Sequence, residues 1–181
     1  GIEYADMQMI SEIYGIMRDG MKLDNHQISQ TFAKWNKGPL KSYLIEITSK
    51  VTAVKDVSTG QPILDLIIDR AGQKGTGRWT AIEAQHLGSP IPVIEAAVTA
   101  RNLSNHLEAR NKGEARYGPA PKALPSGTIS VEYLEAALVA GKILCYAQGF
   151  ALMSSANSAF GWHLPLADIA KVWREGCIIR S

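Results

Sequence analysis

The stretch from about Ile129 to Phe160 constrains the fold of this chain more than any other. Its middle, residues 136–153, is rich in alanine and apolar in nearly every direction around a helix. A helix that is apolar on all sides belongs inside a protein rather than on its surface. The sequence therefore predicts one long, buried helix at the centre of a helical bundle.

Most of the other apolar residues recur every three or four positions, which is the spacing of one helix face. Asp24 or Asn25 is a suitable N-cap for one of these helices, and Ser42 opens the next. The first expected helix is already under way at Gly1 and stops at Asp19-Gly20, with residues 9–17 carrying its apolar face. The others cover, in chain order, residues 25–35, 42–51, 80–87, 91–111, 129–160 and 165–175. We therefore predict an all-α fold in which residues 1–181 form a single domain.

Two segments are less regular. Residues 63–68 are apolar apart from Asp65, which fits a strand or a buried helix, and the leucines and helical surroundings favour a helix. Residues 111–128 hold three prolines and three glycines, so we expect one long surface loop there.

Charge and cysteine content exclude several classes of protein. The formal net charge of +2 is too small to indicate a nucleic-acid-binding or membrane-surface protein. Cys145 and Cys177 lie in apolar surroundings without metal-ligand spacing, so we expect reduced thiols and a cytoplasmic protein. No uninterrupted apolar run approaches the about 20 residues of a membrane span. No histidine pairs with a cysteine or serine as in a catalytic triad, so we expect neither covalent nucleophilic catalysis nor a metal site.

Residues 72–80, here called the glycine-rich segment, read Gly-Gln-Lys-Gly-Thr-Gly-Arg-Trp-Thr. Successive backbone N–H groups in a glycine turn can form an anion-binding nest, and Lys74 and Thr76 supply an ammonium and a hydroxyl for a phosphate. The alternative is a simple connection between helices. The glycine order matches neither the dinucleotide-binding fingerprint nor the P-loop, so we expect neither standard nucleotide site.

Arg101 is the second informative residue, because it follows Ile94 by seven positions and Val98 by three, on an apolar helix face. An arginine facing a core needs a counter-anion, since an unpaired buried charge is very costly. The partner is either a carboxylate of a neighbouring helix or a bound phosphate or carboxylate, which suits guanidinium geometry.

Glu3 and Tyr4 lie at the very start of the chain, in the first turn of the first expected helix. Glu3 suits the helix dipole as a surface acid, and the Tyr4 hydroxyl can hydrogen-bond to an anion. These two residues alone assign no reaction.

Motifs along the whole chain together resemble the 6-phosphogluconate dehydrogenase family. Gly1-Ile2-Glu3-Tyr4 resembles the start of the family's all-helical second domain, and residues 71–80 resemble its glycine-rich substrate loop. The pattern is completed by Ala100-Arg101, by Tyr-Ala-Gln-Gly-Phe-Ala at 146–151 and by Trp-Arg-Glu-Gly-Cys-Ile-Ile-Arg-Ser at 173–181.

The resemblance implies a reaction and roles for individual residues. Enzymes of this family oxidise the C3 hydroxyl of 6-phosphogluconate with NADP, release CO₂ from the β-keto acid and tautomerise the enediol to ribulose 5-phosphate, without a metal. By this resemblance Glu3 is the general acid that protonates the enediol. The implied ligands of the substrate phosphate are Tyr4, Lys74, Thr76 and Arg101.

The resemblance also implies that parts of the enzyme lie outside this chain. These are the Rossmann domain that holds NADP, a catalytic lysine and a His-Asn pair before Gly1, and a C-terminal tail that reaches the partner of a homodimer. We therefore expect half a site and no activity from residues 1–181 alone. Two alternatives remain open: a helical dimerisation module, and a related β-hydroxyacid dehydrogenase acting on an unphosphorylated acid.

Overall fold

The protein is described here from a computed structural model, which covers residues 1–120, 123–125 and 127–180. Over these residues the fold is all-α, as predicted, and the sole β-type pairing is an isolated bridge between Lys55 and Pro62. The elements are α1 (Ile2–Gly15), the π-helix η1 (Ile16–Gly20), α2 (Asn25–Trp35), α3 (Tyr43–Ala53), α4 (Ile63–Leu66), α5 (Thr76–His86), α6 (Pro92–Asn105), α7 (Leu107–Tyr117), α8 (Val131–Phe160) and α9 (Leu166–Val172).

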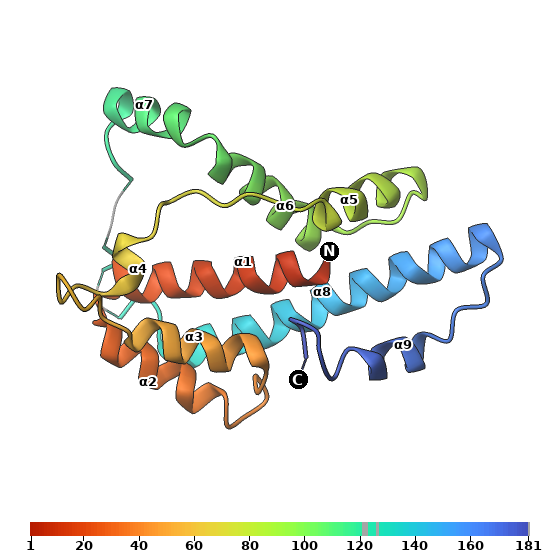
Figure 1. The fold of residues 1–181 in the computed structure, drawn as a ribbon, viewed down its shortest axis with the longest axis horizontal. Coiled ribbons are helices and arrows are strands. Elements are labelled where there is room, and N and C mark those ends of the chain that lie inside the picture. The colour runs from red at the N-terminus through yellow and green to blue at the C-terminus, as the bar shows by residue number, and fades with distance from the viewer. Residues whose placement is uncertain (121–122, 126, 181) are drawn as a thin grey trace.

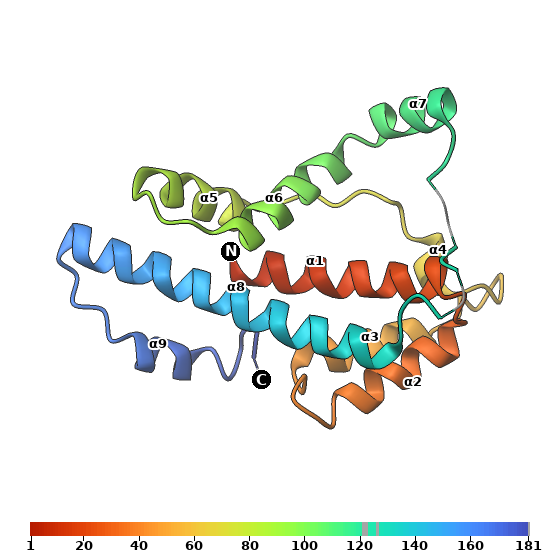
Figure 2. The ribbon, with the colours of Figure 1, turned by 180° about the vertical axis from the view of Figure 1, so that it is seen from behind.

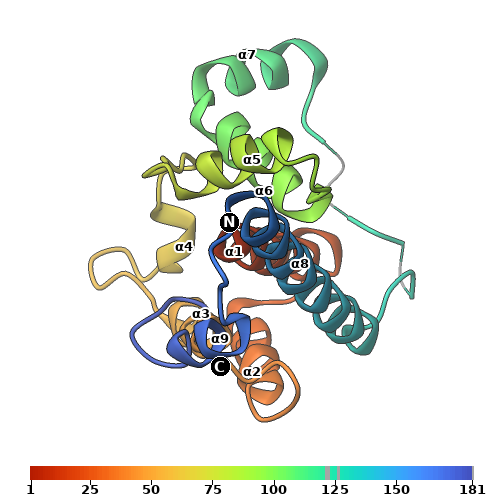
Figure 3. The same ribbon diagram turned by 90° about the vertical axis from the view of Figure 1, so that its right-hand side faces the viewer.

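Helix α1 lies between two clusters of buried side chains and connects them. Its first half, with Ile2 and Tyr4, packs in one cluster with residues of α5, α6 and the second half of α8. Its second half, with Ile10 and Ile13, packs in the other cluster with α2, α3 and the first half of α8. Figures 1 and 2 show α1 and α8 side by side and antiparallel. Figure 3 shows α5 to α7 on one side of this pair and α2 and α3 on the other.

Helix α8 is the longest helix, but it is covered on one face only. The buried residues follow the helical repeat: Leu134, Leu138, Cys145, Gly149, Leu152 and Ala156. On other faces Tyr133, Ile143 and Leu144 are exposed, with Ile143 at 63%. Composition alone predicts how apolar a helix is, whereas its burial depends on how many neighbours reach it.

By length and composition α8 is also apolar enough to cross a membrane, which qualifies the expectation that no stretch is. This is weak evidence for a membrane span, because the core helix of a soluble domain meets the same criteria. Near its middle Lys142 pairs with the buried Asp6 of α1. A charge held inside the fold in this way is consistent with a core helix of a soluble protein.

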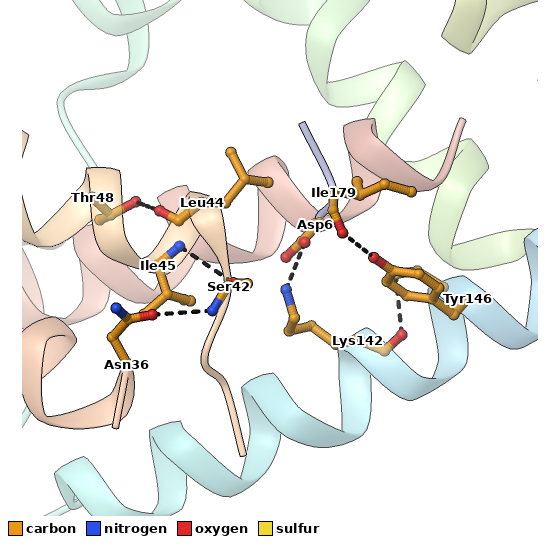
Figure 4. Close-up of polar contacts among 10 residues, drawn as sticks. Asp6, Asn36, Ser42, Leu44, Ile45, Thr48, Lys142, Tyr146 and Ile179 are labelled. Atoms are coloured by element: carbon orange, nitrogen blue, oxygen red, sulfur yellow. Dashed lines mark hydrogen bonds and ion pairs between the residues drawn. The ribbon is translucent and has the colours of Figure 1, made fainter. Parts of the chain in front are cut away.

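The hairpin of α2 and α3 begins where the polar residues predict. The Asp24 carboxylate accepts a hydrogen bond from the Gln27 amide, and the Gln27 side chain accepts one from the Asp24 amide, which is a complete capping box. Ser42 caps α3 by accepting a hydrogen bond from the Ile45 amide, and its own amide donates to Asn36 (Figure 4). Local side-chain chemistry therefore determines both starts.

The helix predicted over 91–111 is two helices. The chain breaks at His106, whose ψ of 49° is not helical, so α6 ends at Asn105 and α7 begins at Leu107. The Arg110 guanidinium of α7 donates to the Ser104 carbonyl at the end of α6 and pairs with Asp69 at 2.7 Å. These side-chain contacts, one of them with the distant Asp69, stabilise a break that local propensity does not require.

The loop predicted over 111–128 is also wrong in its first part, because residues 111–117 belong to α7. A pair between Lys112 and Glu108 at 2.6 Å supports this helix, and Gly113 is tolerated within it. Residues 118–120 and 123–125 are not helical, while residues 121, 122 and 126 lie outside the described residues.

Residues 63–68 form one helical turn rather than a buried element. After Leu66 the chain is extended, and Leu66, Ile67 and Ile68 are all exposed. Leu64, Ile67 and Ile68 line a groove of about 970 Å³ against α1 and α3, so their apolar side chains face a hollow instead of filling a core.

Candidate functional site

The glycine-rich segment is fastened to α6 through three consecutive residues. The Ala71 amide donates to Ser104 Oγ at 2.9 Å, and Arg101 Nη1 donates to the Gly72 carbonyl at 2.9 Å. Gln73 Nε2 donates to Asn102 Oδ1, the side-chain oxygen. The segment is therefore more than a simple connection, because α6 fixes its path just before Lys74.

The segment then turns directly into α5, which begins at Thr76 and not at Thr80 as predicted. Gly75 makes this possible, because its φ of 115° is a backbone conformation that residues with a side chain rarely adopt. Gly75 is also the N-cap of α5 and has no side chain with which to cap the helix. The first turn of α5 thus leaves backbone N–H groups for an anion, as helix N-termini do.

Tyr4 of α1 contacts both α5 and α6, the two helices next to the glycine-rich segment. Its ring is 5% exposed and lies beneath the Arg101 guanidinium, with 4.8 Å between the guanidinium carbon and the ring centroid. Gly77 of α5 packs against the same ring, and a Cβ on Gly77 would lie 2.7 Å from Tyr4 Cε1. Only glycine allows α5 to approach α1 this closely.

A substitution at Gly77 tests this contact. Gly77→Ala is expected to lower the free energy of unfolding by about 1–3 kcal/mol, because the buried Tyr4 ring has little room to move. Gly72→Ala is the matched control, since a Cβ there meets nothing within 4 Å, and its effect should stay within about 0.5 kcal/mol. Urea unfolding of the two variants measures the difference, and equal losses would contradict the contact.

Glu3 lies at the same junction. Thr76 Oγ1 donates to Glu3 Oε1 at 3.1 Å, which brings the first turn of α1 against the first turn of α5. Glu3 also lines a cavity of about 230 Å³ with mostly apolar walls, among them Ile94, Leu152 and Trp173. Glu3 thus accepts a hydrogen bond from Thr76 and also borders an apolar cavity.

The structure therefore brings four of the five predicted site residues together: Glu3, Tyr4, Thr76 and Arg101. Lys74 lies in the same segment with an exposed side chain that has no hydrogen bond or ion pair to any described residue. Arg101 is half-buried, and within the described ranges no carboxylate pairs with it. The salt bridge considered as its alternative role is absent there.

Sequence reasoning missed a buried ion pair near this junction. Lys142 Nζ of α8 donates to Asp6 Oδ2 of α1 at 2.6 Å (Figure 4). Burial and the Asp6 carboxylate raise the pKa of the Cys145 thiol to about 11, and they also raise the pKa of Tyr146. The protonated Tyr146 hydroxyl donates to the Ile179 carbonyl at 2.9 Å. The sequence signal that could have indicated the ion pair was Lys142 itself, a lysine inside the apolar stretch 136–153.

A family model described as 6-phosphogluconate dehydrogenase, C-terminal domain, matches residues 1–181. The chain belongs to the 6-phosphogluconate dehydrogenase family. The match covers the whole chain, so the family resemblance of its motifs is confirmed, and these residues correspond to the family's C-terminal domain.

Relatives agree with this membership. The chain is 46% identical to two proteins of Bacillus subtilis, named 6-phosphogluconate dehydrogenase, NAD(+)-dependent, decarboxylating, and its NADP(+)-dependent counterpart. A solved structure of Plasmodium falciparum 6-phosphogluconate dehydrogenase, described in apo form and in complexes with NADP+ and with 6-phosphogluconate, is 44% identical with a TM-score of 0.94. Each comparison covers 100% of this chain and 39% of the relative. Equal identity to an NAD+ and an NADP+ enzyme favours neither cofactor here.

Proposed function

We propose that this chain is the substrate-binding part of a decarboxylating 6-phosphogluconate dehydrogenase, in which it works with a nucleotide-binding domain outside residues 1–181. The proposal rests on the family membership and on one observation above all. Glu3, Tyr4, Thr76 and Arg101 come from α1, α5 and α6 and meet at one junction. A guanidinium that pairs with no carboxylate among the described residues, together with a hydroxyl, suits the phosphate of a sugar acid.

The 6-phosphate of the substrate is bound at the start of α5 in this proposal. Arg101 supplies a guanidinium. Its hydrogen bond to the Gly72 carbonyl and its stacking on the Tyr4 ring hold it in place before the substrate arrives. Lys74 contributes a second positive charge from an exposed position, and Thr76 contributes a hydroxyl. Charge-assisted hydrogen bonds from preorganised donors are the strong ones in phosphate recognition.

Glu3 acts as the general acid in the last step. Loss of CO₂ from the β-keto acid leaves an enediol. The protonated Glu3 carboxyl then gives its proton to C1 of the enediol, while the C2 hydroxyl gives up its proton to a base that we assign to the part of the enzyme outside this chain, and ribulose 5-phosphate forms. Without substrate, the Thr76 hydroxyl donates to Glu3 and holds its carboxyl at the start of α5. When the phosphate binds, this hydroxyl turns to donate to a phosphate oxygen, and the Glu3 carboxyl faces the carbon chain of the substrate. A nicotinamide dinucleotide supplies hydride acceptance in this reaction. We assign its binding to the part of the enzyme outside this chain, since residues 72–77 have the wrong glycine order for a dinucleotide cradle.

Substrate discrimination tests the proposed function. The full-length enzyme should oxidise 6-phosphogluconate with a kcat/KM at least about 100-fold above that for gluconate, because a bound phosphate supplies several charge-assisted hydrogen bonds. Reduction of NADP or NAD, followed by absorbance, measures both rates. The chain of residues 1–181 alone is the control, and it should reduce neither cofactor.

Equal kcat/KM for the two acids would contradict the phosphate site and favour the second candidate, a β-hydroxyacid dehydrogenase for unphosphorylated acids.

The proposal also includes a cytoplasmic homodimer. Support for the dimer comes from the apolar side chains that α8 leaves uncovered, such as Ile143 and Leu144. Such a surface favours burial against further protein.

A further inference from the structure

Helices α1 and α8 pack closely because small residues of α8 lie under large residues of α1. Gly149 lies beneath Ile2 and Gly141 beneath Met9, and a Cβ on either glycine would overlap the side chain above it. The pairs run in opposite directions along the two helices, which are antiparallel (Figure 2). Each contact needs a glycine beneath a large side chain, so the two contacts favour this alignment as well as a close approach.

Between these two contacts lies the ion pair of Asp6 and Lys142. Asp6 is 1% exposed, the Lys142 side chain is 15% exposed, and their charged atoms are 2.6 Å apart (Figure 4). The second oxygen of Asp6, Oδ1, is buried and has no hydrogen-bond partner among the described residues. An incompletely satisfied buried pair adds little net stability, because the cost of desolvating both charges offsets their attraction. Its best-supported use is to select one register between packed helices.

The register of α1 matters because Asp6 lies one helical turn after Glu3. Sliding α1 by one residue would move its side chains by about 1.5 Å along the axis and rotate them by about 100°. Glu3 would then leave Thr76, and Tyr4 would leave its position between Arg101 and Gly77. The Asp6–Lys142 contact is made in one alignment only, the one that forms the junction.

We propose that Asp6 and Lys142 are positioning residues, whose ion pair fixes α1 on α8 and thereby holds Glu3 at the place from which it donates its proton. This inference rests on the proposed function. Neither residue touches the substrate, and both act through Glu3.

The test replaces the pair in the full-length enzyme by two kinds of neutral pair. Asp6→Val with Lys142→Met replaces the ion pair by an apolar contact that has no preferred direction. The kcat for 6-phosphogluconate should then fall about 10- to 100-fold, because a displacement of the Glu3 carboxyl by about 1 Å has a cost of that order. KM should change less than threefold. Asp6→Gln with Lys142→Gln conserves the combined side-chain length and restores a directional hydrogen bond, so kcat should return to within threefold of wild type.

A cycle with Glu3→Gln separates positioning from simple stabilisation. In that background the apolar pair should change kcat less than twofold, because Glu3 no longer donates a proton. A further tenfold loss in that background, or a wild-type kcat per folded enzyme with the apolar pair, would overturn the proposal. If the apolar pair prevents folding, Asp6→Asn alone is taken through the same cycle, with the same outcomes.

Leu134→Ala, a truncation in the other core cluster, controls for stability and should lower the melting temperature without lowering kcat of the folded enzyme. Loss of kcat in this control equal to that of the apolar pair would also overturn the proposal.

If wild type does not oxidise 6-phosphogluconate, the proposed function and the positioning role are both wrong. If wild type is active and the apolar pair matches it, only the positioning role falls.

Discussion

Glu3→Gln in the full-length enzyme is expected to lower kcat for 6-phosphogluconate by about 10²- to 10⁴-fold, the usual contribution of a positioned general acid. The amide keeps the size of the side chain and can still accept the hydrogen bond from Thr76, but it has no acidic proton for the enediol. KM should change little, because the proposed phosphate ligands are untouched. Steady-state absorbance of the reduced cofactor measures both constants.

Glu12→Gln is the matched control for this variant. Glu12 lies on the same helix, is exposed, and has a hydrogen bond from Gln8 as its local contact. Its kcat should equal that of wild type. A Glu3→Gln enzyme that retains kcat within twofold would remove Glu3 from the proposed mechanism.

Arg101→Ala is expected to raise KM for 6-phosphogluconate by about 10- to 100-fold, since a hydrogen bond to a charged group contributes about 1.5–3 kcal/mol. KM for the nicotinamide cofactor should change much less, because Arg101 is assigned to the substrate phosphate alone. Arg101→Lys should recover part of the loss, because an ammonium keeps the charge but not the planar fork that stacks on Tyr4.

An exposed arginine of α7, Arg116, provides the control for Arg101. Arg116→Ala removes the same charge from the protein and should leave both KM values unchanged. If Arg101→Ala behaves like Arg116→Ala, Arg101 does not bind the substrate, and its contacts with Gly72 and Tyr4 are structural only.

The sequence predicted the parts of this fold that depend on local chemistry. The all-α class followed from apolar spacing, and the starts of α2 and α3 followed from Asp24 and Ser42, whose side chains bond to nearby backbone amides. The break at His106 was missed, because Arg110, Asp69 and the Ser104 carbonyl stabilise it across the chain. Periodicity within one helix contains no information on such contacts.

The candidate site was predicted in the same uneven way. Glycine content and the position of Arg101 on an apolar face pointed to anion binding, and the structure places Arg101 beside the segment that the glycines form. The start of α5 at Thr76 was missed, because it depends on the positive φ of Gly75 and on the Tyr4 ring against Gly77. The role of Glu3 as general acid came from the family resemblance, whereas Lys74 was a phosphate-ligand candidate from the glycine-rich segment itself. The roles of all five site residues stay predictions.

A crystal structure of the full-length enzyme with 6-phosphogluconate tests the central claim most directly. The account predicts that the phosphate lies at the start of α5, within hydrogen-bonding distance of Arg101, Lys74 and Thr76. It also predicts that the Glu3 carboxyl faces the carbon chain of the substrate. A phosphate bound elsewhere, without contact to Arg101 or to the glycine-rich segment, would contradict it.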